Sequence, residues 1–137
     1  MRVARIALAA ATFAIDRPYS YLVPDRLAET LAPGMRVLVP FGRGNRTSEG
    51  LILSLEDQET PPGKLKQVTT ALDDRPVLSK ESLQLALWMR ERFFCTVYDA
   101  ARAMLPAGLY FSLQDSWCLA PGVDRERAYE AAGRSEI

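Results

Sequence analysis

The sequence predicts an α+β fold, a small β-barrel or sandwich of about five short strands followed by two packed helices. The prediction depends on a change in hydrophobic period. Apolar and polar residues alternate through residues 1–72 between turns rich in Pro and Gly, and the period approaches 3.6 over residues 79–105. A length of 137 residues, 48% of them hydrophobic, suits one domain, or one domain with part of a second.

The first strand is predicted over residues 2–8, where Ala4, Ile6 and Leu8 share one face. The same end of the chain also resembles a secretory signal, because Arg2 and Arg5 precede an uncharged run at residues 6–15. That run is far too short to cross a bilayer. We favour the strand.

Four more strands are predicted between turns: residues 19–23, 36–41, 49–55 and 65–72. Pro40 places the end of one of them at a sheet edge, since proline cannot donate a ladder hydrogen bond. The loop of residues 42–46 then joins the second and third of these strands as a hairpin.

Two helices follow, each with a residue suited to cap its first turn. Ser79 precedes the first helix, and Thr96 precedes the second, where Asp99 completes a pattern similar to a capping box. Pro106 ends the second helix. The face of the first helix predicted to be apolar consists of Leu85, Trp88, Met89 and Phe93. Beyond Pro106 we expect a strand over residues 110–119 and a charged helix over residues 124–132.

Composition excludes several kinds of chemistry. The formal net charge is zero and histidine is absent, which removes the commonest general base and metal ligand. Cys95 and Cys118 form no C-x-x-C pair, so a zinc site is unsupported, and two buried, reduced thiols are favoured over a disulfide. No P-loop pattern is present. We therefore predict no catalytic residue, no metal ligand and no cofactor within this chain, and no membrane association.

Candidate ligand contacts gather in the first half of the chain. Arg36, Arg43 and Arg46 could offer guanidinium groups to phosphates, although a solvated hairpin tip explains this loop better on the sequence alone. Most aromatic residues are expected in the core. Tyr19 together with Gly42 and Lys66 could instead stack a base and hold its sugar and phosphate.

A series of segments, in order, resembles the amino terminus of primosomal protein N′, the PriA family of replication-restart helicases. The similarity runs from residue 1 to about residue 110. No single segment is diagnostic, but the ordered set is highly specific. The segments are residues 3–8, 16–24, 33–42, 65–68, 76–78, 87–89, 93–95 and 104–106.

The resemblance implies that residues 1–106, β-rich over 1–72 and helical over 79–105, form the family's DNA 3′-end-binding domain. Such a domain recognises the 3′ end of the nascent leading strand at a stalled replication fork, or single-stranded DNA with a free 3′ end. Residues 107–137 resemble the incomplete start of a winged-helix domain. The family is cytoplasmic, which argues against the secretory signal.

The enzyme activity implied by the resemblance belongs to the parent protein, an ATP-dependent 3′ to 5′ DNA helicase with ATP, Mg and Zn sites further along its chain. Its implied partners are single-stranded DNA-binding protein and primosome or helicase-loading proteins. This part of the chain is expected to have no enzyme activity of its own.

The resemblance implies a 3′-end site at four positions, Tyr19, Ser20, Gly42 and Lys66, and three of the four fit the family's residues. Ser20 departs from the acidic residue found in some members, and a hydroxyl accepts fewer hydrogen bonds than a carboxylate. Either Asp16 or main-chain groups compensate, or the terminal hydroxyl is held less firmly.

Two other classes of function are alternatives to DNA binding: a protein-interaction adaptor and a small enzyme. A β-barrel protein-interaction adaptor of the primosome, without direct DNA contact, is compatible with aromatic strand faces and a Pro-containing link. A small enzyme is disfavoured, because histidine and a P-loop are both absent.

Overall fold

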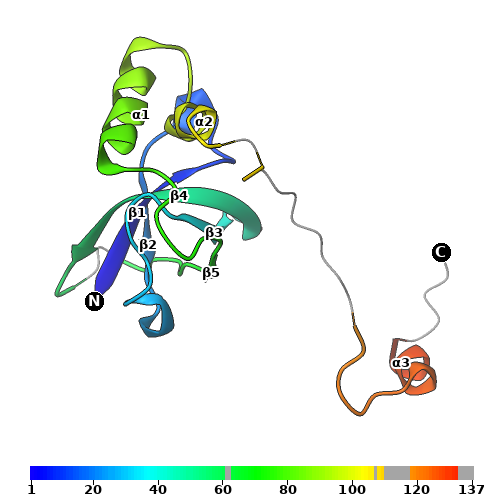
Figure 1. Cartoon of the computed structure of the whole chain (residues 1–137). Helices are drawn as coiled ribbons and strands as arrows, with labels where there is room; N and C mark the ends of the chain where they lie inside the picture. The colour runs from blue at the N-terminus through cyan, green and yellow to red at the C-terminus, as the bar shows by residue number, and fades with distance from the viewer. Residues whose placement is uncertain (61–62, 107, 110–117, 133–137) are drawn as a thin grey trace. The chain divides into compact units, whose positions relative to one another are not determined.

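The computed structural model describes residues 1–60, 63–106, 108–109 and 118–132, and the chain divides into two units, Met1–Pro106 and Ala107–Ile137. The first unit is a five-stranded antiparallel sheet with two α-helices, labelled in Figure 1. The predicted α+β class is thus confirmed.

The five strands are ordered β2-β1-β4-β3-β5 in one sheet. Three of the predicted strands agree within one residue, and β4 is longer at both ends than predicted. The fifth is much shorter than the predicted residues 65–72. The strands are β1 (Arg2–Leu8), β2 (Tyr19–Leu22), β3 (Arg36–Phe41), β4 (Arg46–Asp57) and β5 (Thr70–Ala71).

The sheet is not a closed barrel, which corrects the barrel or sandwich prediction. Its two edges meet only where a parallel bridge pairs Leu22 of β2 with Gln67, just ahead of β5. The Leu22 N–H donates to the Lys66 carbonyl at 2.8 Å, and the Val68 N–H donates to the Leu22 carbonyl at 3.0 Å. These two bonds join the segment before β5 to β2 at a single bridge.

The main core lies on one face of the sheet. It holds alternate residues of the central strands, as the period-two pattern predicts, together with Tyr21 and Val68 from the two edges that meet. Its fully buried members include Ala4, Ile6, Leu8, Val37, Val39 and Ile52. The core thus joins the central strands to both edges of the sheet, and the burial of apolar side chains is its main stabilising contribution.

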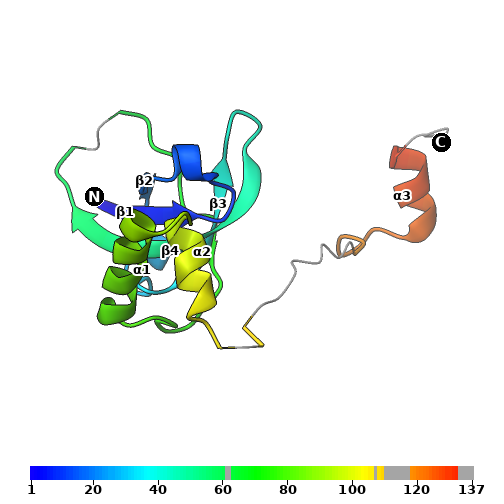
Figure 2. The ribbon, with the colours of Figure 1, turned by 90° about the horizontal axis from the view of Figure 1, so that it is seen from above.

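Helices α1 (Lys80–Arg92) and α2 (Val97–Ala103) pack against each other, and α2 contacts β1. Figure 2 shows the two helices side by side across one side of the sheet. Both predicted caps are confirmed: the Ser79 hydroxyl accepts from the Ser82 N–H at 3.2 Å, and the Thr96 hydroxyl accepts from the Asp99 N–H at 3.0 Å.

The predicted apolar face of α1 is wrong. Leu85, Trp88 and Phe93, expected inside, are 45%, 47% and 56% exposed, while Leu83 and Ala86 are buried. Apolar residues occur on more than one face of this helix, so the period alone does not tell which face packs. The side carrying small Ala86 is the buried one, since a small side chain allows close approach to neighbouring elements.

The second unit contains helix α3 (Arg125–Ala132), in agreement with the predicted charged helix. The Asp124 carboxylate accepts from the Arg127 N–H at 2.8 Å and caps it. The strand predicted over residues 110–119 falls mostly on residues 110–117, outside the described residues.

Both cysteines are free thiols, but the prediction that both are buried is wrong, because Cys95 is half-buried and Cys118 is exposed. Within the described ranges, no helix has the length and apolar character needed to span a membrane.

Candidate nucleic-acid interface

Three of the four residues predicted to form the site lie at one rim of the sheet. Tyr19 begins β2, Gly42 follows β3, and Lys66 lies on the segment bonded to β2. The Lys66 ammonium donates to the Gly42 carbonyl at 2.6 Å. The rings of Tyr19 and Phe41 meet edge to face with centroids 5.2 Å apart, which brings Tyr19 next to the same turn.

Contacts from its neighbours hold the Tyr19 ring in place. Its hydroxyl donates to the Ile15 carbonyl at 2.8 Å, and the Arg17 guanidinium carbon lies 5.5 Å from its ring centroid. The ring is half-buried, whereas Gly42 and Lys66 are exposed. Sequence reasoning did not assign Phe41 and Arg17 to the site, although each adjoins a site residue or turn in the chain.

Gly42 has open space around the position that a side chain would take. Its φ of +71° is a conformation that favours glycine, and a Cβ atom here would meet no other heavy atom within 4 Å. The hairpin returns through Asn45, which also has a positive φ of 48°. The turn thus exposes backbone beside Lys66 and leaves room for a ligand group to approach.

Ser20 has a different partner from the other three residues. Its hydroxyl accepts a hydrogen bond from the Arg5 guanidinium at 2.8 Å, across the β1–β2 pair. Asp16, a candidate to replace the missing acid, has a side chain only 1% exposed. It accepts hydrogen bonds from Arg90 at 2.7 Å and from the Val97 N–H at 2.9 Å. Asp16 is therefore a structural residue and does not compensate for Ser20.

The three arginines predicted to contact phosphate have different environments. Arg43 and Arg46 are exposed at the β3–β4 hairpin, next to Gly42. Arg36 is only 2% exposed and pairs with Asp73 at 2.6 Å, with Glu49 3.8 Å away. The prediction for Arg36 is therefore wrong, because its guanidinium is buried and pairs with the buried Asp73 carboxylate.

Tyr21 connects the two strands that carry the rim, β2 and β3. Its hydroxyl donates to the Pro40 carbonyl at 3.0 Å, linking β2 to the end of β3. Burial raises the pKa of Tyr21 to about 12, so the phenol stays neutral at physiological pH. The position of Tyr19 relative to the Gly42 turn thus depends on a neutral, buried hydrogen bond.

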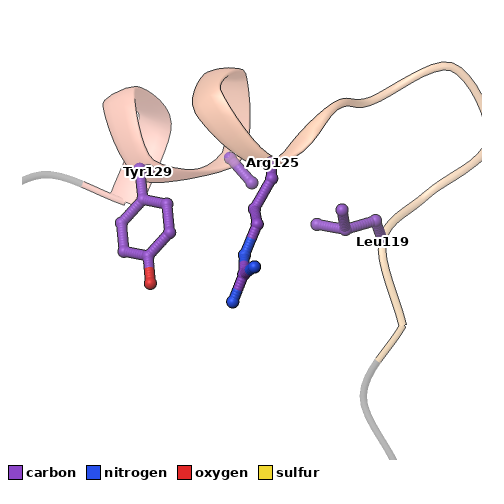
Figure 3. Close-up of a pocket in the computed structure, with 4 residues that line it drawn as sticks. Leu119, Arg125 and Tyr129 are labelled. Atoms are coloured by element: carbon purple, nitrogen blue, oxygen red, sulfur yellow. The ribbon is translucent and has the colours of Figure 1, made fainter.

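A separate hollow lies in the second unit. Figure 3 shows Leu119, Arg125 and Tyr129 around it, with Ala128 completing the lining. None of the predicted site residues lines this hollow. The residues that the structure describes contain no group of three or more Cys, Asp or Glu side chains arranged to hold a metal ion.

The fold and the rim together have the features of a nucleic-acid-binding domain: an aromatic ring, an ammonium group, open backbone and nearby arginines. A family model described as the 3′ DNA-binding domain of PriA matches residues 5–106. The chain therefore belongs to the family of PriA 3′ DNA-binding domains.

Curated relatives carry the same name. The chain is 34% identical over 125 residues to the replication restart protein PriA of Bacillus subtilis, a match covering 90% of this chain and 15% of the relative. It is 31% identical to the probable replication restart protein PriA of Mycobacterium tuberculosis, covering 68% of this chain and 14% of the relative. It is 26% identical to PriA of Treponema pallidum, covering 87% and 19%. The chain thus spans less than a fifth of the length of these relatives.

Proposed function

We propose that residues 1–106 bind the 3′ end of a DNA strand, and that this strand is the nascent leading strand at a stalled replication fork. The observation that carries the proposal is the proximity of Tyr19, Gly42 and Lys66. These residues come from distant parts of the chain and share one exposed rim, joined by the 2.6 Å Lys66–Gly42 hydrogen bond.

The chemistry of each group suits a terminal nucleotide. The Tyr19 ring stacks on the base without regard to its identity, contributing about 1–3 kcal/mol. The Lys66 ammonium has two further N–H groups after bonding Gly42, and these donate to sugar or phosphate oxygens. Ser20 and its partner Arg5 offer a hydroxyl and a cation in place of the acidic residue of other members.

A free 3′ terminus ends in a hydroxyl where an internal nucleotide continues into a phosphodiester. A site that is closed beyond the terminal sugar rejects the interior of a strand by steric exclusion, and this gives selectivity without reading the base sequence. Arg43 and Arg46 attract the phosphates of the preceding nucleotides. With zero net charge, the 137-residue chain binds modestly and with a shallow dependence on salt.

The proposal extends to the longer protein. We place this domain in a cytoplasmic ATP-dependent 3′ to 5′ helicase that restarts replication with single-stranded DNA-binding protein and primosome or helicase-loading proteins. ATP, Mg²⁺ and Zn²⁺ belong to other domains of that protein, while residues 107–137 begin its winged-helix domain. Residues 1–106 then sense the end of a strand and have no catalytic role.

The test is a fluorescence anisotropy titration with forked DNA. Lys66→Ala is expected to weaken binding to a free 3′ end about tenfold, because a charge-assisted hydrogen bond contributes about 1.5 kcal/mol. Lys64→Ala, an exposed lysine two residues away, is the matched control and is expected to bind like the unmodified chain. Tyr19→Ala is expected to weaken binding to a similar extent, and Tyr19→Phe to retain most of the affinity.

The same titration compares a 3′-hydroxyl with a 3′-phosphate on otherwise identical forks. Stronger binding of the hydroxyl end supports a site that is closed beyond the terminal sugar. Equal affinity for the two ends, or equal losses for Lys66→Ala and Lys64→Ala, contradicts the proposal.

A protein-interaction adaptor is the second candidate, favoured by a groove between α1 and β4. The groove has a volume of about 470 Å³ and a largely apolar lining that includes Pro33, Leu53, Leu55, Leu83 and Leu87. Peptide titration beside a gel shift with 3′-tipped and 5′-tipped forks separates the candidates. Peptide binding without preference for a 3′ tip favours the adaptor.

A further inference from the structure

A second aromatic surface lies on the loop between α1 and α2. Phe94 is 87% exposed, more than the other large hydrophobic residues of the described chain. Its ring stacks on that of Phe13, with centroids 4.2 Å apart and planes inclined by 30°. A large apolar ring so fully exposed to water marks a contact surface more often than an ordinary surface position.

The stack is capped by an arginine. The Arg90 guanidinium carbon lies 3.9 Å from the Phe13 ring centroid. Two groups this close to one ring cannot share a face, so Phe13 lies between Arg90 and Phe94. The series therefore runs from the Arg90 guanidinium through the Phe13 ring to the Phe94 ring, and the outer face of Phe94 is exposed to solvent. A further flat aromatic group, such as a nucleobase, would continue this series.

A buried carboxylate, that of Asp16, fixes the position of the Arg90 guanidinium in this stack. Asp16 accepts from the Arg90 Nε at 2.7 Å and from the Val97 N–H at 2.9 Å, so it joins the guanidinium to the start of α2. A second guanidinium nitrogen of Arg90 donates to the Phe13 carbonyl at 3.3 Å. Because these contacts exist without ligand, binding a base there costs little ordering of protein side chains.

The surface is connected to the Tyr19 site through one short turn. Phe13 and Ile15 begin and end the 3-10 turn η1 (Phe13–Ile15), and the Ile15 carbonyl accepts the hydrogen bond from the Tyr19 hydroxyl. Arg17, two residues after Ile15, lies over the Tyr19 ring. A DNA strand bound at Tyr19 therefore has arginines and a second stacking surface on the adjoining part of the domain.

We propose that the exposed face of Phe94 stacks on a DNA base other than the terminal one. The proposal rests on the proposed 3′-end function, because it takes its ligand from the same strand or fork. Phe94 and Tyr19 then hold two separated bases, which sets the path of the DNA across η1. The arginine at the far end of the stack favours an electron-rich base over an aliphatic protein side chain.

The experiment compares two ligands. A 3′-terminal dinucleotide reaches only the Tyr19 site, whereas a fork with a longer strand reaches both surfaces. Phe94→Ala is expected to weaken binding of the fork by about fivefold or more, the loss of one stacked base, and to leave dinucleotide binding unchanged in an NMR shift titration. Tyr129→Ala, another exposed aromatic residue, is the matched control and is expected to change neither.

Two further variants separate stacking from simple apolar contact. Phe94→Trp is expected to bind the fork at least as tightly as the unmodified chain, and Phe94→Leu to bind as weakly as Phe94→Ala. Unchanged melting temperatures show that the fold is intact. Fork binding by Phe94→Leu equal to that of the unmodified chain, or no loss with Phe94→Ala, overturns the proposal.

The failures of the two proposals are distinguishable. If Tyr19→Ala weakens dinucleotide binding but Phe94→Ala leaves fork binding unchanged, the 3′-end site stands and the Phe94 surface does not. If Tyr19→Ala leaves dinucleotide binding unchanged, the 3′-end site itself fails. Equal weakening of both ligands by Phe94→Ala also overturns the inference, because Phe94 would then act through the Tyr19 site.

Discussion

Replacing Arg36 tests whether this arginine supports the fold or contacts a ligand. Its side chain is 3% exposed, and that of Asp73 is 7% exposed. The pair is bidentate, with Nη2 to Oδ1 at 2.6 Å and Nε to Oδ2 at 3.0 Å, and the Arg36 backbone N–H also donates to Asp73 at 2.8 Å. This hydrogen bonding to Asp73 raises the pKa of Arg36 further above its ordinary value.

The magnitude follows from what Arg36→Ala leaves behind. The Asp73 carboxylate stays buried with the backbone N–H as its remaining donor from residue 36, and Glu49 loses a nearby cation. Removing one partner of a buried ion pair costs about 3–5 kcal/mol, a large fraction of the roughly 5–15 kcal/mol of a small domain. Arg36→Ala/Asp73→Ala removes both charges, and we expect it to be less destabilised than the sum of the single variants by about 1–3 kcal/mol.

Urea unfolding followed by circular dichroism measures these free energies, and DNA titration of the same variants measures binding. Arg43→Ala is the control, since this exposed arginine is expected to change stability by no more than about 0.5 kcal/mol. A stable Arg36→Ala variant that loses DNA affinity would refute the reasoning, because Arg36 would then face the ligand.

Three other outcomes are expected. Burial raises the pKa of Tyr21 to about 12, so the unfolded chain releases this proton near pH 10 while the folded chain keeps it. The resulting stability is complete below about pH 10 and is lost as the pH rises towards 12; Tyr21→Phe should remove that part of the alkaline loss in urea unfolding at each pH. Gly34→Ala should lower the melting temperature strongly, because φ is +88° and a Cβ atom would lie 2.1 Å from the Leu78 carbonyl oxygen. Gly44→Ala is the control, since a Cβ atom there would face open space. Equal melting temperatures for the two variants would contradict the steric argument. Thr96→Ala should cost about 1 kcal/mol in chemical unfolding by removing the cap of α2, and no loss would mean that the cap is redundant.

The strands and caps were predictable because their determinants are local. Alternation of apolar residues, stopped by Pro and Gly, indicates where β1 and β3 lie, and a hydroxyl residue before an apolar run indicates where α1 and α2 begin. These signals involve residues a few positions apart. They do not depend on how the elements pack.

The errors arose where partners are distant in the sequence. Arg36 pairs with Asp73, 37 positions later, and the sequence shows two charged residues without showing that they meet. The apolar face of α1 was misassigned because Leu83 and Leu85 lie on different sides of the helix, and only packing decides which is buried. The expectation that most aromatic residues lie in the core is also wrong for Phe94, which is 87% exposed.

Residue chemistry offers Tyr19, Gly42 and Lys66 as candidates, and the family resemblance joins them, with Ser20, into one site. Alternation places Tyr19 on a strand and Gly42 in a turn, but nothing local brings Lys66 to the carbonyl of Gly42. That approach requires the chain before β5 to meet β2, a long-range pairing. Phe41, the ring against Tyr19, looked like one more apolar residue of a strand.

The two backbone bonds between Leu22 and the segment at Lys66 and Val68 form a narrow seam in the domain. Tyr19 and Lys66 lie on opposite sides of that seam, each on the chain that one of these bonds secures. A nucleotide bound by both residues would therefore link two edges of the sheet that are joined here by two backbone hydrogen bonds. Ligand binding would then add to the stability of this pairing, because it favours the state in which β2 and the segment before β5 lie together.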